Sequence, residues 1–176
     1  MHLPLVFITQ KKIGDELRAI YRENLGGAAE LLFAADGLDD AARAVAEAEV
    51  LIVGNLRIEL TEDERGNLEN VGLIQALTAG VDHIPFSTLP AAVPVAYNPG
   101  VYAEPMAEHV VAMAFAAGKR LSGEHAAMRD GAFNQFAPTR RMAGSTCAIL
   151  GFGGVGRAVA DKLGALGVSI HAVNRG

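Results

Sequence analysis

The sequence predicts an α/β protein in which parallel strands alternate with helices, and three observations support this class. Short apolar runs alternate with helical stretches over residues 1–100. Further along, a glycine-rich turn follows an apolar run that ends at Leu150, and a helical pattern follows the turn. Another apolar run, Val168 to Val173, completes a strand-helix-strand unit. We therefore expect a parallel-sheet domain followed by a separate β-α-β unit.

The first hundred residues contain the pattern of a parallel sheet covered by helices on both faces. Thr61, with Glu64 three residues later, has the spacing of a capping box that opens a helix. The expected elements, in order, are a strand over Leu3–Thr9, a helix from Ile13 to Leu25 ended by Gly26-Gly27, a strand over Leu31–Ala34, a helix from about Leu38 to Ala48, a strand over Val50–Gly54, the polar helix opened by Thr61, a strand over Leu73–Leu77, a turn over Thr78–Asp82 and a strand over Pro94–Tyr97.

A different region begins after the break at Asn98-Pro99-Gly100. The residues from Ala103 to Leu121 favour one long helix, with Glu104 near its start and Lys119-Arg120 at its end, as the helix dipole prefers. The middle of this helix is apolar on every face, so it must be enclosed. Two interpretations are open, namely a homodimer interface and burial within the same chain.

The glycine-rich turn is typical of the first β-α-β unit of a Rossmann dinucleotide-binding domain. Gly151 would allow the tight turn, Gly153 the close approach of a pyrophosphate, and Gly156 the packing of the helix on its strand. The amides of Gly154 and Val155, at the positive end of the helix, would face the phosphates. The alternative is a glycine-rich turn without a ligand.

The end of the second strand predicts which dinucleotide binds. About 20 residues after the glycines, this fold commonly has an acid that holds the ribose 2′-hydroxyl, and here Asn174 and Arg175 stand there instead. Asn does not repel a 2′-phosphate, and a guanidinium pairs with one. We therefore predict NADP, with NAD as the second choice. In the alternative interpretation Arg175 is a solvated residue at a strand end.

Composition excludes several classes of function. The net charge is −5, and the 15 Lys and Arg are dispersed, so a nucleic-acid surface is not expected. The apolar runs are too short for a secretory signal or a membrane span. A single cysteine, Cys147, gives neither a disulfide framework nor a metal cluster. These features favour a soluble cytoplasmic protein without a metal site.

Five short motifs follow one another in a distinctive order: Leu77-Thr78-Ala79-Gly80-Val81-Asp82, Asn98-Pro99-Gly100, Met106-Ala107-Glu108, Met142-Ala143-Gly144-Ser145-Thr146 and the glycine-rich turn. This order resembles that of the D-isomer-specific 2-hydroxyacid dehydrogenases, which include glyoxylate/hydroxypyruvate reductases and phosphoglycerate dehydrogenases. The resemblance extends from about Val50 to the end. It implies a flavodoxin-like substrate domain over residues 1–100, and over residues 101–176 an interdomain helix with an incomplete Rossmann domain.

The resemblance also implies roles for individual residues. Backbone amides of Ala79, Gly80 and Val81 would bind the substrate carboxylate, an anion that such amides suit. Gly154 and Val155 match pyrophosphate-contacting positions, and Asn174-Arg175 match the ribose-reading positions, where NADP-preferring members often carry a basic residue. The long helix resembles the family's interdomain helix, which contributes to dimer contacts.

The expected catalytic residues are missing from the sequence. In the family, an Arg that grips the 2-oxo acid, a His that protonates the carbonyl oxygen and a Glu that tunes that His all come later in the cofactor domain, and none of those motifs occurs here. Only His83 lies near the expected substrate turn, and no adjacent motif orients it as a proton donor. No catalytic residue is therefore assigned in this chain.

Two functions are carried forward. One is a portion of an oxidoreductase that transfers a hydride between NADP(H) and a small 2-oxo or 2-hydroxy acid such as glyoxylate or hydroxypyruvate, inactive as the 176-residue chain. The other is a non-catalytic module that dimerises and at most binds dinucleotide. The last strand would have an uncovered edge, so three possibilities are open: a longer polypeptide, a second chain that covers the edge, or poor local order.

Overall fold

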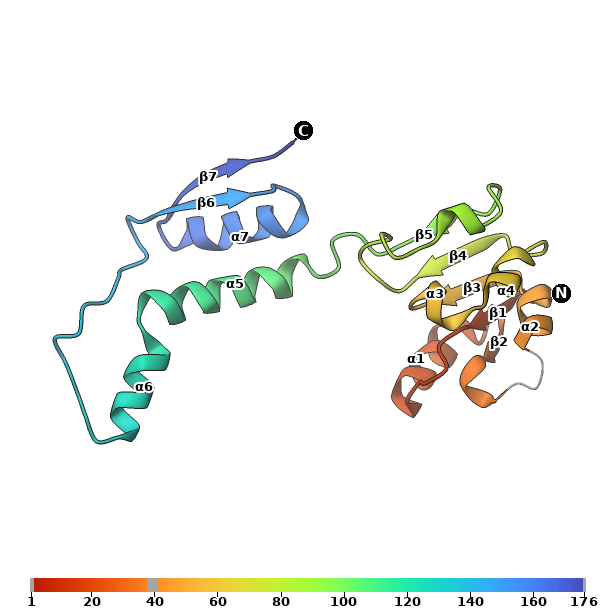
Figure 1. Ribbon diagram of the computed structural model, residues 1–176, viewed down its shortest axis with the longest axis horizontal. Coiled ribbons are helices and arrows are strands. Elements are labelled where there is room, and N and C mark those ends of the chain that lie inside the picture. Colours follow the sequence, from red (N-terminus) through yellow and green to blue (C-terminus); the bar gives the residue numbers. More distant parts are fainter. Residues whose placement is uncertain (1, 38–40, 176) are drawn as a thin grey trace. The chain divides into compact units, whose positions relative to one another are not determined.

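The chain folds into two compact units, Met1–Pro99 and Gly100–Gly176. The structure is a computed structural model that describes residues 2–37 and 41–175 (Figure 1). The boundary expected from the sequence, after residue 100, falls beside the division between the units. The described residues of each unit enclose their own apolar core.

The described part of the Met1–Pro99 unit contains five parallel strands in the order β2-β1-β3-β4-β5. This order is that of flavodoxin-like doubly wound sheets, so the predicted fold class is confirmed. The elements are β1 (Leu5–Ile8), α1 (Asp15–Leu25), β2 (Glu30–Phe33), the 3-10 turn η1 (Ala34–Asp36), α2 (Ala41–Glu47), β3 (Val50–Val53), α3 (Leu56–Glu59), α4 (Glu62–Gly66), β4 (Leu73–Ala76), the 3-10 turn η2 (Phe86–Thr88) and β5 (Val95–Ala96).

Both faces of this sheet are buried. Side chains alternate along each strand, so that one face packs into one core and the other face into a second core. On β1, Val6 and Ile8 join the core that includes Tyr21 of α1, whereas Phe7 joins the opposite core, which includes Val45 of α2. Ile8 and Val45 are completely buried. Because β1, β3 and β4 are parallel neighbours, their carboxyl ends lie at the same edge of the sheet.

The local predictions for this unit agree closely with the structure. The capping box is confirmed: the Glu64 amide donates to Thr61 Oγ1 at 3.3 Å, and the Thr61 amide donates to Glu64 Oε2 at 2.6 Å. The helix expected from Leu38 is seen as α2, while Leu38 itself lies outside the described residues. The short helix α3 was not expected. The Arg57 amide in its first turn donates to the Asn55 side chain.

The described part of the Gly100–Gly176 unit contains the predicted β-α-β arrangement. Its elements are α5 (Ala103–Gly118), α6 (Leu121–Arg129), β6 (Thr146–Leu150), α7 (Gly154–Ala165) and β7 (Ser169–Val173). β6 and β7 pair in parallel, from Thr146 opposite Ser169 to Leu150 opposite Val173. Within this unit α7 packs on both the strands and α5, and Lys162 Nζ lies 2.8 Å from Glu104 Oε2 of α5.

The prediction of one helix from Ala103 to Leu121 was wrong at its end. α5 stops at Gly118, and Arg120 has a φ of 57°, in the left-handed region. The Lys119 amide bonds back to Phe115 O at 2.8 Å, which closes the last turn, and Leu121 begins α6. The chain therefore changes direction where a continuous helical pattern was expected.

The surface of α5 is enclosed on one side only within the described residues. Ala107 is completely buried among residues of α7, whereas Met106 and Met113 are 49% and 59% exposed. Burial within this unit thus accounts for part of the apolar composition of the helix. The described residues leave the other part exposed, and the dimer stays a prediction.

Candidate functional site

The glycine-rich turn between β6 and α7 has the backbone geometry that its sequence predicted. Gly151 adopts a φ of +93°, a conformation that favours glycine. Gly153 is the N-cap of α7. A Cβ added at Gly156 would overlap the carbonyl oxygen of Gly151, so the close approach of helix and turn requires glycine there. Two of the three motif glycines are therefore fixed by conformation or space.

The first turn of α7 is suited to an anion. Its opening residues are Gly154, Val155 and Gly156, and the first intrahelical bond shown there runs from Arg157 N to Gly153 O at 3.0 Å. The amides before Arg157 have no intrahelical acceptor. No acidic residue stands in this turn, and Val155 is 38% exposed. The end of the helix that carries partial positive charge is consequently accessible.

The end of β7 lies directly beside this turn. The Gly151 amide donates to Val173 O at 2.8 Å, which continues the pairing of β6 with β7. The next residues, Asn174 and Arg175, are exposed. Asn174 Oδ1 accepts from the Phe152 amide at 3.4 Å, and among the described residues no carboxylate pairs with Arg175. The structure thus brings the predicted phosphate and ribose positions together.

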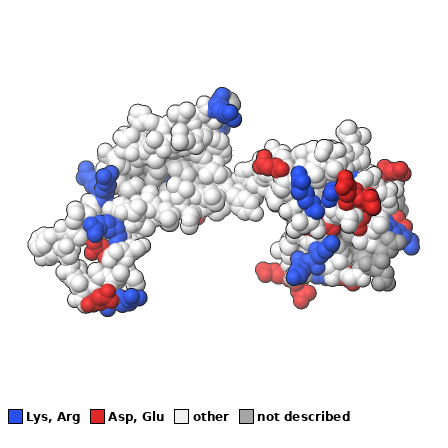
Figure 2. Space-filling view, in the orientation of Figure 1, with Lys and Arg blue, Asp and Glu red and all other residues white. Residues whose placement is uncertain are grey.

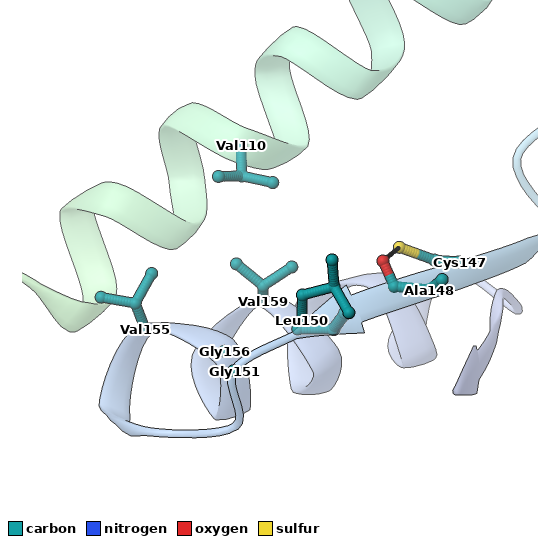
Figure 3. Close-up of a pocket in the computed structure, with 9 residues that line it drawn as sticks. Val110, Cys147, Ala148, Leu150, Gly151, Val155, Gly156 and Val159 are labelled. Carbon is teal, nitrogen blue, oxygen red and sulfur yellow. Dashed lines mark hydrogen bonds between the residues drawn. The ribbon is translucent and has the colours of Figure 1, made fainter. Parts of the chain in front are cut away.

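An apolar hollow of about 350 Å³ opens next to the turn. In Figure 3, Val110 of α5 points toward Val155 and Val159 of α7 across this hollow, while Leu150 and Cys147 project from β6. Leu150 is 89% exposed in the described chain. The hollow borders Gly151 and Gly156, so the motif lines its wall.

The turn after β4, in the other unit, holds Ala79, Gly80 and Val81. Thr78 Oγ1 donates to Gly80 O at 2.7 Å, which fixes the turn. Among the described residues, the amides of Ala79, Gly80 and Val81 donate to no protein acceptor. These three amides are therefore available to an anion such as a carboxylate.

Arg57 and Leu56, near this turn, differ in exposure. Arg57 Nε donates to His83 O at 3.0 Å, and the rest of its exposed guanidinium faces no partner among the described side chains. Leu56, in contrast, is completely buried in the core and lines no surface. His83 Nε2 is a buried atom without a hydrogen-bond partner in the described residues.

Sequence reasoning missed a polar network at the carboxyl ends of β1 and β3. Glu59 Oε2 accepts from Thr9 Oγ1 at 2.6 Å and from the Gly54 amide at 2.9 Å. Burial, together with the Glu59 charge, raises the pKa of Tyr21. The only signal in the sequence was a carboxylate placed between Ile58 and Leu60, which is too common to interpret. The described residues contain no group of ligands that could hold a metal ion.

Comparisons with known proteins bear on both units. Residues 111–176 match the family model described as D-isomer specific 2-hydroxyacid dehydrogenase, NAD binding domain. A search among curated proteins gave no match. The solved structure of a glycerate dehydrogenase related protein from Thermoplasma acidophilum is 30% identical, with a TM-score of 0.68 over 98% of this chain and 54% of that one.

Two further solved structures share the fold at lower identity. D-lactate dehydrogenase from Aquifex aeolicus, complexed with NAD and lactic acid, is 22% identical, with a TM-score of 0.76 over 98% of this chain and 51% of that one. A probable 2-hydroxyacid dehydrogenase from Rhizobium etli, in complex with NADP, is 20% identical, with a TM-score of 0.77 over 100% of this chain and 53% of that one. The chain spans about half the length of these proteins.

The sheet order, the glycine-rich turn and the family match define an α/β protein with a nicotinamide-dinucleotide-binding fold. Residues 111–176 match the NAD binding domain of the D-isomer-specific 2-hydroxyacid dehydrogenase family, which confirms the resemblance found in the sequence. Among the described helices, none has the length and apolar character needed to cross a membrane.

Proposed function

We propose that this chain is a portion of an NADP-dependent 2-hydroxyacid dehydrogenase that reduces a small 2-oxo acid, such as glyoxylate or hydroxypyruvate. The observation that supports this most strongly is the turn from Gly151 to Gly156, whose geometry suits a pyrophosphate, within a segment that matches the family model. The nicotinamide would supply the hydride. The residues of this chain would bind the dinucleotide phosphates and the substrate carboxylate.

The choice of NADP rests on charge at the end of β7. Arg175 is exposed and has no carboxylate partner among the described residues, so its guanidinium is available to a 2′-phosphate. Asn174 stands where an acid would repel that phosphate. Related folds have been solved with NAD and with NADP, so the local charge has to decide.

The substrate would bind through the free amides of Ala79, Gly80 and Val81. Backbone donors hold a carboxylate in a fixed direction without a flexible charged side chain. Arg57, tethered to His83 O beside this turn, would add a positive charge for the same anion. This part of the proposal concerns the small 2-oxo acid as a class.

The chain alone is proposed to be inactive. Reduction of a ketone needs a positioned proton donor near the carbonyl oxygen, and no described residue is assigned that role. A titration of the 176-residue chain with NADPH, followed by a turnover assay with glyoxylate, tests this. We expect saturable NADPH binding without glyoxylate-dependent oxidation. Measurable turnover would contradict the inactivity, and absence of NADPH binding would favour the non-catalytic module.

Replacement of the β7-end cation tests the cofactor. In Arg175→Asp a charge-assisted pair with the 2′-phosphate becomes a repulsion, so the ratio of NADPH to NADH affinity should fall by about tenfold or more. Arg129→Asp makes the same charge change at an exposed position of α6 and serves as the control. An unchanged ratio in Arg175→Asp would remove the NADP assignment.

We also propose that the chain forms a homodimer through the exposed side of α5. Met106, Val110 and Met113 are exposed there and succeed one another at helical spacing. In the view of Figure 2, the surface over α5 and α7 carries few charged side chains, whereas acidic and basic groups are interspersed over the Met1–Pro99 unit. A weakly charged apolar surface favours association with another protein surface.

A further inference from the structure

The turn after β4 is fixed to its surroundings by the carbonyl oxygens that lead into it. The Leu77 amide donates to Val53 O of β3 at 2.9 Å, and Asn98 Nδ2 donates to Ala76 O at 3.3 Å. These two bonds involve one peptide unit, and they reach toward β3 and toward the segment after β5, on opposite sides of β4 (Figure 1). The N–H and C=O of a trans peptide point in opposite directions, and the described part of the chain contains no cis peptide. A bond to a carbonyl oxygen therefore also fixes where the following amide points.

Two peptides inside the turn are fixed in this way. The Asn98 amide donates to Thr78 O at 3.1 Å, so the Ala79 amide points away from Asn98. Thr78 Oγ1 donates to Gly80 O at 2.7 Å, so the Val81 amide points away from the Thr78 hydroxyl. The amides of Ala79 and Val81 donate to no protein acceptor among the described residues. Both free amides are thus directed away from the groups that hold the turn.

The hydroxyl of Thr78 can influence an anion only through the peptide that it holds. It has one hydrogen atom, which is engaged by the Gly80 carbonyl, so it cannot donate to an anion at the same time. Gly80 has no Cβ, and its side of the peptide is therefore free to rotate over a wide range. The hydroxyl is the side-chain group that restricts this rotation.

Two charges of opposite sign flank the turn. Arg57 Nε donates to His83 O at 3.0 Å, and Asp82 Oδ2 would lie 3.4 Å from a Cβ added at Gly80. A positive side chain attracts a carboxylate, whereas the Asp82 carboxylate repels it. Because these two effects oppose each other, the direction of the amide dipoles matters for an anion at this turn.

We propose that Thr78 is a positioning residue for the anion-binding turn: its hydroxyl holds the peptide between Gly80 and Val81 so that the Val81 amide is offered to a substrate carboxylate. The inference rests on the proposed substrate site and adds to it a side chain that acts without touching the substrate. A donor whose direction is fixed before binding loses less conformational entropy when the anion binds. Loss of the hydroxyl should consequently weaken the binding of a carboxylate.

Titration with oxamate, a small carboxylate that resembles a 2-oxo acid, tests the effect on binding. In the isotope-labelled 176-residue chain, the Ala79 and Val81 amide resonances should shift saturably. Thr78→Val keeps the volume and removes the hydroxyl, and we expect oxamate affinity to fall by about two- to tenfold. Thr78→Ser retains the hydroxyl and should bind within about twofold of the wild type. Equal affinities of Thr78→Val and the wild type would overturn the positioning role.

Thr88→Val is the matched control. Thr88 Oγ1 donates to Pro85 O at 3.0 Å, so this variant also loses a hydrogen bond from a threonine to a carbonyl oxygen, in the same unit but outside the turn. A general loss of stability should affect both valine variants, whereas oxamate affinity should stay unchanged in Thr88→Val. If Thr88→Val weakens oxamate binding as much as Thr78→Val does, Thr78 has no specific role.

Two NMR signals of the free protein report the orientation of the peptide. In Thr78→Val the carbonyl carbon of Gly80 should shift upfield, because it loses a hydrogen bond, and the coupling between the amide and α protons of Val81, which depends on φ, should change. Both signals should match the wild type in Thr78→Ser and Thr88→Val. Weaker oxamate binding in Thr78→Val with an unchanged Val81 coupling would show that the hydroxyl acts on the anion directly, which overturns the positioning role.

The two kinds of measurement separate this inference from the proposed function. If the wild type binds oxamate at the turn and Thr78→Val binds it equally well, the substrate site stands and the role of Thr78 is wrong. If the Ala79 and Val81 amides of the wild type do not respond to oxamate, the proposed substrate site fails, and the effect of Thr78 on binding fails with it. The Gly80 and Val81 signals then decide whether the hydroxyl holds the peptide.

Discussion

At the scale of single residues, Thr9 is a buried polar residue whose hydroxyl is held by its neighbours. Its side chain is completely buried, its hydroxyl lies 2.6 Å from Glu59 Oε2, and it lies 3.2 Å from Ile52 O. The same carboxylate accepts from the Gly54 amide. The network thereby connects the ends of β1 and β3 through the last residue of α3.

Removal of this hydroxyl should destabilise the Met1–Pro99 unit. Thr9→Val keeps the volume but leaves Glu59 with one donor fewer, and we expect a loss of about 1–3 kcal/mol in the free energy of unfolding, measured with urea. Thr146→Val makes the same change at an exposed position of β6 and should alter stability by less than about 0.5 kcal/mol. Equal free energies of unfolding for Thr9→Val and the wild type would mean that this hydrogen-bond network does not stabilise the unit.

The chemistry of these residues was only partly visible in the sequence. The motif predicted Gly151, Gly153 and Gly156, because their spacing depends on a local turn. Contacts such as Thr9 with Glu59, or Phe152 with Asn174, join residues that are distant in sequence. They arise from the parallel pairing of strands, and no local pattern indicates them.

At the scale of elements, helix α7 combines a position where glycine is required with one where it is not. A Cβ at Gly156 would overlap the Gly151 carbonyl, while a Cβ at Gly164 would meet no atom within 4 Å. Both residues belong to the same helix. This pair allows the cost of close packing to be separated from the general effect of glycine on helix stability.

We expect Gly156→Ala to destabilise the β-α-β unit by about 1–3 kcal/mol, because the turn and the helix must move apart. Gly164→Ala, near the exposed end of the helix, should be neutral or stabilising by up to about 1 kcal/mol. Thermal unfolding followed by circular dichroism measures both. Gly156→Ala should lose NADPH binding, whereas Gly164→Ala should retain it. If Gly156→Ala binds NADPH as the wild type does, the packing argument for this glycine is wrong.

The sequence predicted helices and strands well where apolar residues recur regularly, and less well where one helix ends and another begins. The strands of both units follow their apolar runs, and the Thr61 capping box stands where its sequence indicated. The end of α5 was missed because Lys119 and Arg120 favour helix locally. The left-handed φ of 57° at Arg120 marks the break between α5 and α6.

At the scale of the whole molecule, oligomeric state follows from the surface of α5. Met113 is 59% exposed and borders a second hollow, of about 340 Å³, together with Ala116, Ala117 and Arg120. An apolar side chain next to a hollow can pack against the same surface of a second copy around a twofold axis. The prediction is a dimer whose interface includes Met113.

Sedimentation over a range of concentrations tests the interface. The wild type should sediment as a dimer, and Met113→Glu should shift it toward monomer, because a charge in an apolar interface has no partner. Met128→Glu, at a 62% exposed position of α6, is the control and should stay dimeric. A wild type that is monomeric throughout would remove the homodimer.

The hollow beside the glycine-rich turn has a practical consequence, because Cys147 is the only cysteine of the sequence and lines that hollow. A maleimide fluorophore would attach to a single known position without any thiol having to be removed first. Its emission would respond when a nucleotide, a second copy or additional polypeptide covers this surface. The natural sequence therefore offers a single attachment site for a fluorescent probe beside the turn whose ligand binding is to be measured.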